Sequence, residues 1–584
     1  MKYINKNYDV VVGIDFGSSG CGFAFSFMNE DKIYHCDIRG ADVDKKIPTE
    51  IILDDNNEIL AFGPNCNQYL REKGLNKGHY FKRIKMHLYD KQKTIKSSNS
   101  DKTLPLTFVI QKVLEKLKDL CLEQLRKSWN NIDESNIKWV VTVTAIWGEF
   151  EKGMMMEACE NINLIDKNDD KSLFFALEPE AASYYCCRKE NINEQYVTEG
   201  NFYIVCDLGG GTGDIVAHLV GNNGNLEEFS TPRGGAYGSN EIDKKIFKQI
   251  IKNLFGYEDF FSLQQKYKEL AIREEEVVIY DGWCNLEKSI KDFKEGITLK
   301  KIQNKDKYPI CCDVFQDFFE DNDLDINDLV DKYNETVKDD DLKLNVRSKK
   351  KWIIEFPYKI IENYIEEQSK LICKEIMDIT SKIIEEINAI IFVGGYCANE
   401  VLISKIKNGL NKNYNYIQPY NPSLAIMDGA VLFGLDPSII NIRIAKYTIG
   451  METNGIWDDK KHLEKGKKVY DKINKFWRCE KCFEKFIEVN QRIKYDETLP
   501  PKSFSMLGPR KTTLKFYKSL KTNPVFTFES GVEKIVECEL DAKKDYPIGE
   551  RGFKVNMSFG GTYIDVRAIH EKSGEQIEIN LNYE

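Results

Sequence analysis

The sequence predicts an α/β protein in which two similar halves face one another across a cleft, followed by an antiparallel β domain. An apolar run that turns at a glycine-rich tip occurs at 8–27 and again at 203–217, each time followed by an amphipathic helix. Beyond residue 440 short alternating apolar segments replace this pattern, as in antiparallel sheets. We therefore expect two units, residues 1–440 and residues 441–584.

The size of the chain indicates more than one domain, and its charge limits the classes of partner that it can bind. The chain has 584 residues, too many for one hydrophobic core, and 42% of them are hydrophobic. Lysine and arginine number 83 against 93 aspartates and glutamates, and the net charge of −10 disfavours nucleic acid and anionic membranes as partners. The first ten residues lack a signal peptide's apolar stretch, and no run approaches the ~20 apolar residues that span a bilayer. The sequence predicts a soluble, cytoplasmic protein and leaves its oligomeric state open.

The spacing of apolar residues predicts the elements of the first unit. Residues 109–125 place apolar side chains at every fourth position, which predicts an amphipathic helix, and 139–147 is a buried strand. The stretch 301–350 is first acidic and then basic, which predicts a solvated peripheral insertion. The remaining predicted elements are helices at 246–255, 361–376 and 423–434 and a strand at 389–395.

The second unit shows the alternation most clearly at 553–568. Its large apolar residues share one face of the predicted strand: Phe553, Val555, Met557 and Phe559. The junction at 436–451 has no flexible Gly/Ser linker, and its isoleucines can dock against either unit, which favours mechanical coupling over loose tethering.

Sixteen cysteines are spread along the chain, many of them inside apolar runs, as is typical of small buried side chains in a reducing compartment. Cys479 and Cys482 form a single CxxC. There is no second cysteine pair and no histidine at the usual ligand spacing, so the pair favours packing beside 483–489 over a zinc site.

The first glycine-rich turn, in GIDFGSSGCGF at 13–23, is suited to phosphate. Gly17 and Gly20 permit positive φ and let backbone N–H groups converge on an anion, and Ser18 and Ser19 add hydroxyl donors. Asp15, just before the tip, can hold the water shell of a Mg²⁺ ion that neutralises phosphate charge. Taken alone, the motif is equally compatible with an ordinary tight turn.

The second turn, in CDLGGGTGD at 206–214, combines three successive glycines with acids on both sides. The glycines allow close backbone approach to a ligand, and Thr212 offers a further donor to phosphate. Asp207 can order an attacking water or accept its proton, and Asp214 follows the tip. A glycine-rich surface turn is the alternative for this motif alone. The three glycines are Gly209, Gly210 and Gly211.

Both turns resemble the two phosphate motifs of the actin, sugar-kinase and heat-shock ATPase superfamily, and three further segments resemble its other motifs in the same order. FALEPEAASYY at 175–185 resembles the first connecting motif, IIFVGGYCANEVL at 390–402 the adenosine motif, and NPSLAIMDGAVLFG at 421–434 the second connecting helix. Within the superfamily, the chain resembles the 70-kilodalton heat-shock proteins. The strings ALEPEAAS, GGAYG and GAVLFGLDPS are similar to those of their divergent twelfth-member branch, and the resemblance covers residues 8–584.

This resemblance implies a two-lobed actin-like (ribonuclease H-like) ATPase fold that binds ATP or ADP with Mg²⁺. Asp15, Asp207 and Glu178 match the family's magnesium-shell and water-positioning acids, with Asp15 and Asp207 on the metal side. Lys85, in FKRIKMHL at 81–88, matches the lysine directed at the γ-phosphate, and a surface lysine is the alternative. The matched nucleotide-binding positions are Gly17, Ser18, Ser19, Gly209, Gly210, Gly211, Thr212, Asp214, Gly394 and Gly395, and Gly235, Tyr237 and Gly238 are expected to line the cleft.

The nucleoside side departs from the family pattern at two places. After Gly394 and Gly395 the chaperones place an arginine that stacks on adenine, whereas this chain has Ala398, which predicts altered adenine affinity or selectivity. Glu287 and Lys291 match the acid and base that hold the nucleoside, but their spacing is one residue longer than in the chaperones.

The resemblance implies a chaperone-like ATPase in which Mg-ATP modulates a C-terminal β domain that binds peptide or protein clients. A nucleotide-sensing scaffold with negligible turnover is the second hypothesis. A small-molecule kinase on the same fold is a third, and the sequence offers no acceptor-site base or sugar pocket for it. The client and any exchange partner stay open.

Overall fold

The structure is a computed structural model. It describes the chain except for residues 1–7, 31, 37–45, 75–76, 130–131, 166–171, 189–197, 258–262, 264–275, 317–318, 320–324, 384, 411, 413, 464, 473–474, 495–496, 498, 559–564 and 584. Within the described part, no helix has the length and apolar character that crossing a membrane requires.

The first sheet is built on the N-terminal hairpin. Strands β1 (Val10–Phe16) and β2 (Gly20–Phe27) are antiparallel, as the sequence predicts for 8–27. Strand β10 (Ile137–Val143) pairs in parallel with β1, and β11 (Leu173–Leu177) pairs in parallel with β10. The strand predicted at 139–147 therefore ends earlier, at Val143. Its last apolar residues are buried in a turn and not in the sheet.

The second sheet repeats this arrangement. Strands β12 (Phe202–Leu208) and β13 (Gly213–Val220) form the second hairpin, β19 (Ile387–Val393) pairs in parallel with β12, and β20 (Asn415–Ile417) pairs in parallel with β19. The order β20-β19-β12-β13 thus corresponds to β11-β10-β1-β2 of the first sheet. Beyond β13 the second sheet continues through β14 (Leu226–Glu228), β21 (Ile440–Ile444) and β25 (Arg492–Lys494).

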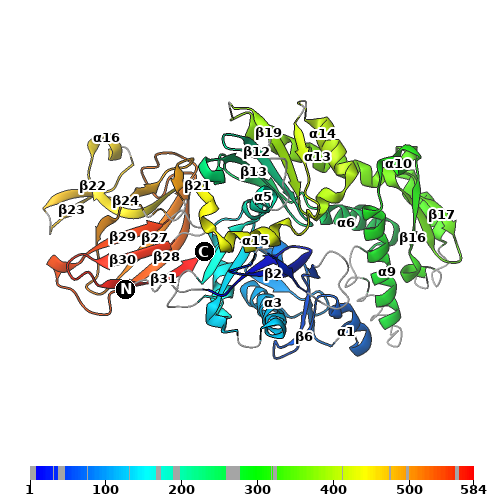
Figure 1. Cartoon of the computed structure of the whole chain (residues 1–584), viewed down its shortest axis with the longest axis horizontal. Helices are drawn as coiled ribbons and strands as arrows, with labels where there is room; N and C mark the ends of the chain where they lie inside the picture. Colours follow the sequence, from blue (N-terminus) through cyan, green and yellow to red (C-terminus); the bar gives the residue numbers. More distant parts are fainter. Residues whose placement is uncertain are drawn as a thin grey trace.

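Two helices, α5 (Glu178–Arg188) and α15 (Ala425–Leu435), lie between the two sheets (Figure 1). They pack closely because glycines remove side chains from the contacts. A Cβ atom on Gly429 would lie 1.8 Å from the carbonyl oxygen of Ala181, and one on Gly13 would lie 3.0 Å from the Cβ of Ala430. The sheets and these helices therefore form one closely packed centre.

Alternate residues of the central strands face different cores, which explains why both faces of β1 and β12 are apolar. Val10 of β1 packs in a core with α3 (Leu106–Ser128), whereas Val11 packs between the sheets. Ile204 of β12 belongs to a third core, which includes α13 (Tyr358–Thr380) and α14 (Glu400–Gly409), whereas Val205 faces the layer between the sheets.

The predicted insertion at 301–350 is peripheral but also contributes to a core. It packs beside α9 (Glu276–Glu295) at one end of the molecule (Figure 1). Strands β16 (Lys307–Cys311), β17 (Asn345–Ser348) and β18 (Ile353–Pro357) form a small sheet there. Phe315 and Val330 are buried in the same core as β12. The acidic stretch therefore also contains apolar residues that pack into this core.

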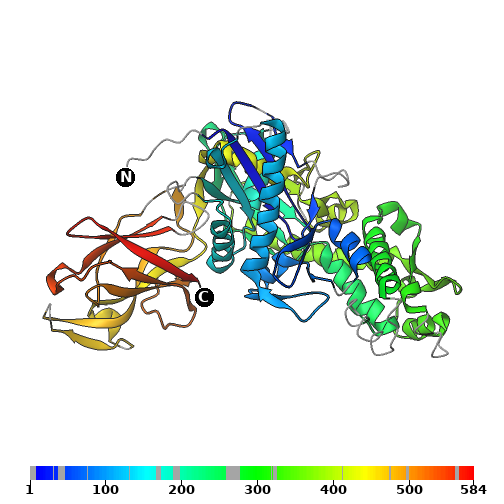
Figure 2. The same cartoon turned by 90° about the horizontal axis from the view of Figure 1, so that it is seen from below.

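A nine-stranded sheet, antiparallel at every pairing, lies at the opposite end of the molecule (Figure 2). Its described strands include β22 (Thr448–Ile456), β24 (Phe476–Ile487), β27 (Lys511–Ser519), β28 (Val532–Asp541), β29 (Gly552–Ser558), β30 (Asp565–His570) and β31 (Gln576–Tyr583). The run predicted at 553–568 is divided between β29 and β30. Phe553, Val555 and Met557 are buried on β29, and Phe559 lies outside the described residues.

The two parts meet through β21, and residue 440, at the predicted boundary, is the first residue of this strand. Strand β21 pairs in parallel with β14 and antiparallel with β25. The guanidinium of Arg443 forms two hydrogen bonds, of 2.8 and 2.6 Å, with the carboxylate of Glu180 on α5, and both side chains are buried.

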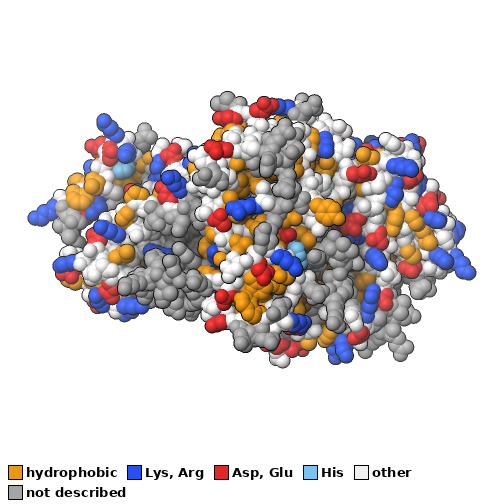
Figure 3. Space-filling model, in the orientation of Figure 1, with side chains coloured by type: hydrophobic (Ala, Val, Ile, Leu, Met, Phe, Trp, Pro, Cys, Tyr) orange, Lys and Arg blue, Asp and Glu red, His pale blue; other side chains and the backbone are white. Residues whose placement is uncertain are grey.

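On the surface, basic and acidic side chains are interspersed over the face in Figure 3, so neither sign dominates it.

Candidate functional site

The two glycine-rich turns are in direct contact. A Cβ atom on Gly210 would lie 1.8 Å from the hydroxyl oxygen of Ser19, and one on Gly211 would lie 2.6 Å from that of Ser18. The side-chain amide of Asn240 donates a hydrogen bond of 2.8 Å to Ser19. Only glycine allows this approach, so the second turn requires residues without side chains at its tip.

The segment that begins α6 (Asn240–Ile246) supports the second turn from behind. The backbone N–H of Gly238 donates to the carbonyl oxygen of Gly211, and that of Asn240 donates to the carbonyl oxygen of Gly210. Gly235 pairs with Gly213 at the base of the turn. The ring of Tyr237 packs against these glycines, and its hydroxyl donates to Glu375 on α13 at 3.2 Å. Gly235, Tyr237 and Gly238 therefore hold the turn in place.

Four buried carboxylates lie by the turns, each no more than 4% exposed: Asp15, Glu178, Asp207 and Asp214. Asp15 accepts a hydrogen bond of 3.0 Å from Thr142, and Asp214 accepts one of 3.0 Å from the backbone N–H of Ile146.

Lys85, on α2 (Ile84–Tyr89), is buried and forms an ion pair with Glu178. Its ammonium group also lies 5.3 Å from the centre of the Trp147 ring, within the range of a cation–π contact. The lysine and the acid that the sequence analysis matched separately are thus adjacent, although they are far apart along the chain. A surface position for Lys85, the alternative in the sequence analysis, is wrong.

The electrostatics of the cluster suit a divalent cation. Burial, together with the carboxylates of Glu178 and Asp214, raises the pKa of Asp207 well above its usual range, and burial and Glu178 raise the pKa of Asp214 to about 7. One carboxylate oxygen of Asp207, Oδ1, is buried and has no hydrogen-bond partner among the described residues. Oxygen ligands of this kind fit Mg²⁺ and its water shell.

Lys46 is part of the cluster, and the sequence analysis did not identify it. Its ammonium group lies 2.6 Å from a carboxylate oxygen of Asp15. Burial acts to lower its pKa, but Asp15, Asp207 and Glu178 outweigh that effect and raise it. The position follows from strand β4 (Ile47–Pro48), which pairs with the start of β2. No motif in the sequence marks this pairing.

A cavity of about 590 Å³ lies along α6 and α9, and its described lining contains no residue of the two turns. Its lining includes Lys82, Lys244, Phe247, Trp283 and Glu287. The helix predicted at 246–255 begins earlier, as α6, and passes through a π-helical turn at Phe247–Ile251 into α7 (Lys252–Phe255). Such turns are frequent at functional sites, and this one widens the helix at the cavity.

The predicted nucleoside residues are not all brought together. Glu287 lines the cavity and pairs with Lys82 at 3.4 Å, whereas the Lys291 side chain is 64% exposed and pairs with Glu295 at 3.8 Å. Gly394, with φ +87°, lies against Asp207: a Cβ atom there would be 2.6 Å from Oδ1 of the acid. Gly395 and Ala398 are exposed beyond it, away from the described cavity lining.

The mixed α/β fold, with two glycine-tipped hairpins in contact beside buried acids and lysines, is consistent with the actin-fold ATPases of the 70-kilodalton heat-shock type. No family model matches the sequence. Over 99% of its length the chain is similar to Heat shock 70 kDa protein 12A of Homo sapiens and of Mus musculus, at 25% identity and with 92% of each covered. It is 23% identical to Heat shock 70 kDa protein 12B of Homo sapiens, with 91% covered. The resemblance to the twelfth-member branch is thereby confirmed.

Proposed function

We propose that this chain binds Mg-ATP between two lobes, hydrolyses it slowly, and couples its nucleotide state to a C-terminal β domain that binds peptides or proteins. One lobe is built on the β1 sheet and the other on the β12 sheet, within residues 1–440, and residues 441–584 form the β domain. The observation that carries the proposal is the contact between the turns at Ser19 and Gly210, next to four buried carboxylates.

Each part of the cluster has a role in this proposal. The turn N–H groups and the hydroxyls of Ser18, Ser19 and Thr212 bind phosphate oxygens. Mg²⁺, when held through Asp15 and Asp207, neutralises phosphate charge. When all four carboxylates are ionised, the ammonium groups of Lys46 and Lys85 leave an excess of two negative charges. A divalent ion neutralises this excess and thereby lowers the raised pKa values of Asp207 and Asp214.

In this proposal Asp207 acts on the nucleophilic water and its proton, and Lys85 acts on the transferred phosphoryl group. The raised pKa of Asp207 suits a group that orients a water molecule and accepts its proton. Lys85, held by its ion pair with Glu178, directs a positive charge at the transferred phosphoryl group. Because both groups are buried, their electrostatic effect is stronger than it would be in water.

Coupling to the β domain is supported by the turn at 144–148. On one side of this turn, the N–H of Ile146 binds Asp214 and the ring of Trp147 lies by Lys85. On the other side, Lys446, just after β21, donates hydrogen bonds to the carbonyl oxygens of Ala145 and Trp147. A shift of the acids on nucleotide binding therefore has a direct route to the strand that leads into the β domain.

The client-binding part of the proposal is supported by apolar side chains near the edge strand β23 (Lys468–Asp471). Ile456 is 68% exposed, and the rings of Tyr470 and Trp477 pack against each other while both stay about half exposed. An edge strand with exposed apolar neighbours suits an extended peptide, which adds backbone hydrogen bonds and fills side-chain pockets.

The proposal is tested with Asp15→Asn and Asp207→Asn. Single-turnover hydrolysis of Mg-ATP should fall by at least about 100-fold in both variants. Asp119→Asn, at an exposed carboxylate on α3, is the matched control and should hydrolyse ATP like the wild type. Full hydrolysis in both site variants would refute the assignment.

A nucleotide-sensing scaffold with negligible turnover is the second candidate. It is favoured by Lys46, because this lysine places a built-in cation against Asp15. Calorimetric titration with ATP, with and without magnesium, separates the two candidates when it is combined with the single-turnover measurement. Tight binding without phosphate release would select the scaffold.

A further inference from the structure

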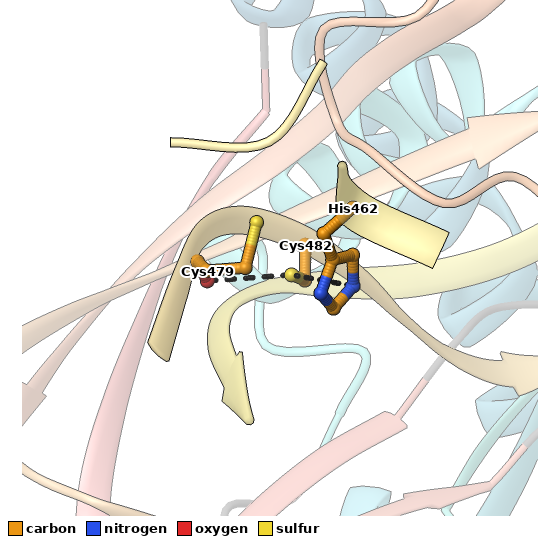
Figure 4. Close-up of side chains that lie close together, drawn as sticks. All are labelled: His462, Cys479 and Cys482. Atoms are coloured by element: carbon orange, nitrogen blue, oxygen red, sulfur yellow. Dashed lines mark hydrogen bonds between the residues drawn. The ribbon is translucent and has the colours of Figure 1, made fainter. Parts of the chain in front are cut away.

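We propose that His462, Cys479 and Cys482 form a zinc-binding site in the nine-stranded sheet. One potential ligand atom from each residue lies within 4.8 Å of the others, and Sγ of Cys482 is 3.8 Å from Nε2 of His462. All three side chains are buried, with exposures of 6%, 0% and 8% in chain order. Figure 4 shows them close together, with the histidine from α16 (Asp459–His462) and both cysteines from β24.

The backbone of β24 is shaped to bring the cysteines together. In a regular strand, residues three apart point to opposite faces. Here Cys482 lies opposite Thr453 and Cys479 opposite Gly455, so three steps along β24 match two along β22. This bulge, with Lys481 at φ +56°, turns both sulfur atoms to the same side. A non-glycine residue in that conformation is unusual and marks a constrained site.

The histidine explains why the sequence did not predict the site. His462 lies well before the CxxC, outside the usual ligand spacings, and only the fold returns it to the cysteines. From the CxxC alone, simple packing was therefore the expected role of the pair. Two soft sulfur ligands and an imidazole instead form a donor set that selects zinc over magnesium or calcium.

The distances match those of a zinc ion with modest adjustment. With Zn–S bonds of about 2.3 Å and Zn–N bonds of about 2.1 Å, tetrahedral geometry places sulfur and nitrogen about 3.6 Å apart and two sulfurs about 3.8 Å apart. The observed separation of Cys482 and His462 is 3.8 Å, and all pairs are within 4.8 Å. Shifts of up to about 1 Å bring all three ligands onto one ion.

Room for the sulfur atoms is provided by glycines. A Cβ atom on Gly466 would lie 2.7 Å from Sγ of Cys479, and one on Gly455 would lie 3.2 Å from Sγ of Cys482. The rings of Trp457 and Phe526, centred 5.5 and 5.8 Å from the histidine ring, form an apolar wall. Three protein ligands leave a fourth position for water.

When zinc binds, the two cysteine thiols release their protons. The product is a neutral complex of Zn²⁺ with two thiolates and one imidazole. Four hydrogen bonds are given up. Those of the sulfur atoms join Cys479 to the carbonyl oxygen of Glu480 (3.7 Å), Cys482 to the carbonyl oxygen of Cys479 (3.3 Å) and Cys482 to Nε2 of His462 (3.8 Å). The N–H of Asp458 also loses its bond to Nδ1 of His462 (3.0 Å), because a ring that coordinates through Nε2 carries its proton on Nδ1. The ion would then link the turn at α16 to β24.

The test uses the full chain purified without a polyhistidine tag. Wild type should hold one zinc ion per chain by elemental analysis, and cobalt(II) in its place should give thiolate-to-metal charge-transfer absorption. Cys479→Ser, Cys482→Ser and His462→Gln should each weaken zinc binding by more than about 100-fold. Cys311→Ser, which removes a half-buried thiol on β16, is the matched control and should bind zinc like the wild type.

A second measurement covers variants that fail to fold. After a chelator removes zinc from the wild type, the midpoint of urea unfolding should fall, and added zinc should raise it again. An unchanged midpoint, or zinc retained in a variant lacking both cysteines of the CxxC, would overturn the proposal.

Discussion

Replacing Asp214 by asparagine should stabilise the nucleotide-free chain at neutral pH. Burial and the carboxylate of Glu178 raise the pKa of Asp214 from 3.8 to about 7. Between these values the folded chain holds a proton that the unfolded chain has lost, so the free energy of unfolding falls as pH rises. A difference of about 3 in pKa, at about 1.4 kcal/mol for each unit, corresponds to about 4 kcal/mol lost between about pH 4 and pH 7.

Asparagine removes this loss without removing the local hydrogen bond. Its amide oxygen can still accept from the N–H of Ile146, which donates to Asp214 at 3.0 Å. The variant should therefore gain up to about 4 kcal/mol at about pH 8 and little at about pH 4, where the wild-type carboxyl group is protonated in both states. The attraction of Lys85 for the carboxylate is already included in this magnitude.

Urea unfolding, followed by tryptophan fluorescence at several pH values, measures the effect. Both Trp147, whose ring lies by Lys85, and Trp139, on strand β10, are buried and report on unfolding of this part of the chain. Asp119→Asn is again the control, because this exposed side chain is away from the cluster. If Asp214→Asn and the wild type lose stability in parallel as pH rises, the assumption of a buried carboxyl group that resists ionisation is wrong.

Three further predictions concern other parts of the structure. Gly210→Ala places a methyl group 1.8 Å from the hydroxyl of the facing turn, so Mg-ATP affinity should fall by at least about 10-fold in calorimetry; unchanged affinity would mean that the turns do not share a ligand. Arg443→Met leaves Glu180 buried and unpaired and should cost about 3–5 kcal/mol in urea unfolding, most of it recovered by adding Glu180→Gln. Lys46→Met removes the cation beside Asp15, so the magnesium concentration needed for half-maximal ATP binding should fall by about 10-fold.

The parts of the fold that could be predicted are those with a local signal. The hairpins at 8–27 and 203–217 are evident because an apolar run, a glycine-rich tip and a second apolar run are adjacent in the chain. The burial of Phe315 within the acidic insertion was missed, because an average over charged residues hides a single anchor.

The candidate site was predictable to the extent that its residues lie within motifs. Asp15 and Asp207 occupy fixed places beside the turns, both are buried, and both attract the ammonium group of Lys46. Lys46 and His462 reach their partners only through tertiary contacts, so neither is marked by its neighbours in sequence. Lys291 was assigned from the family resemblance, although its spacing departs from that of the family, and its side chain is 64% exposed and pairs with Glu295.

The position of β21 determines how the chain can be divided for experiments. A recombinant fragment that ends at residue 440 would keep only the first residue of this strand, and the rest of the edge of β14 would be left with unpaired N–H and C=O groups. It would also leave Glu180 buried without its guanidinium partner. Such a fragment should self-associate through the open edge, so nucleotide binding is better measured on a chain that retains both neighbours of this strand, β14 and β25.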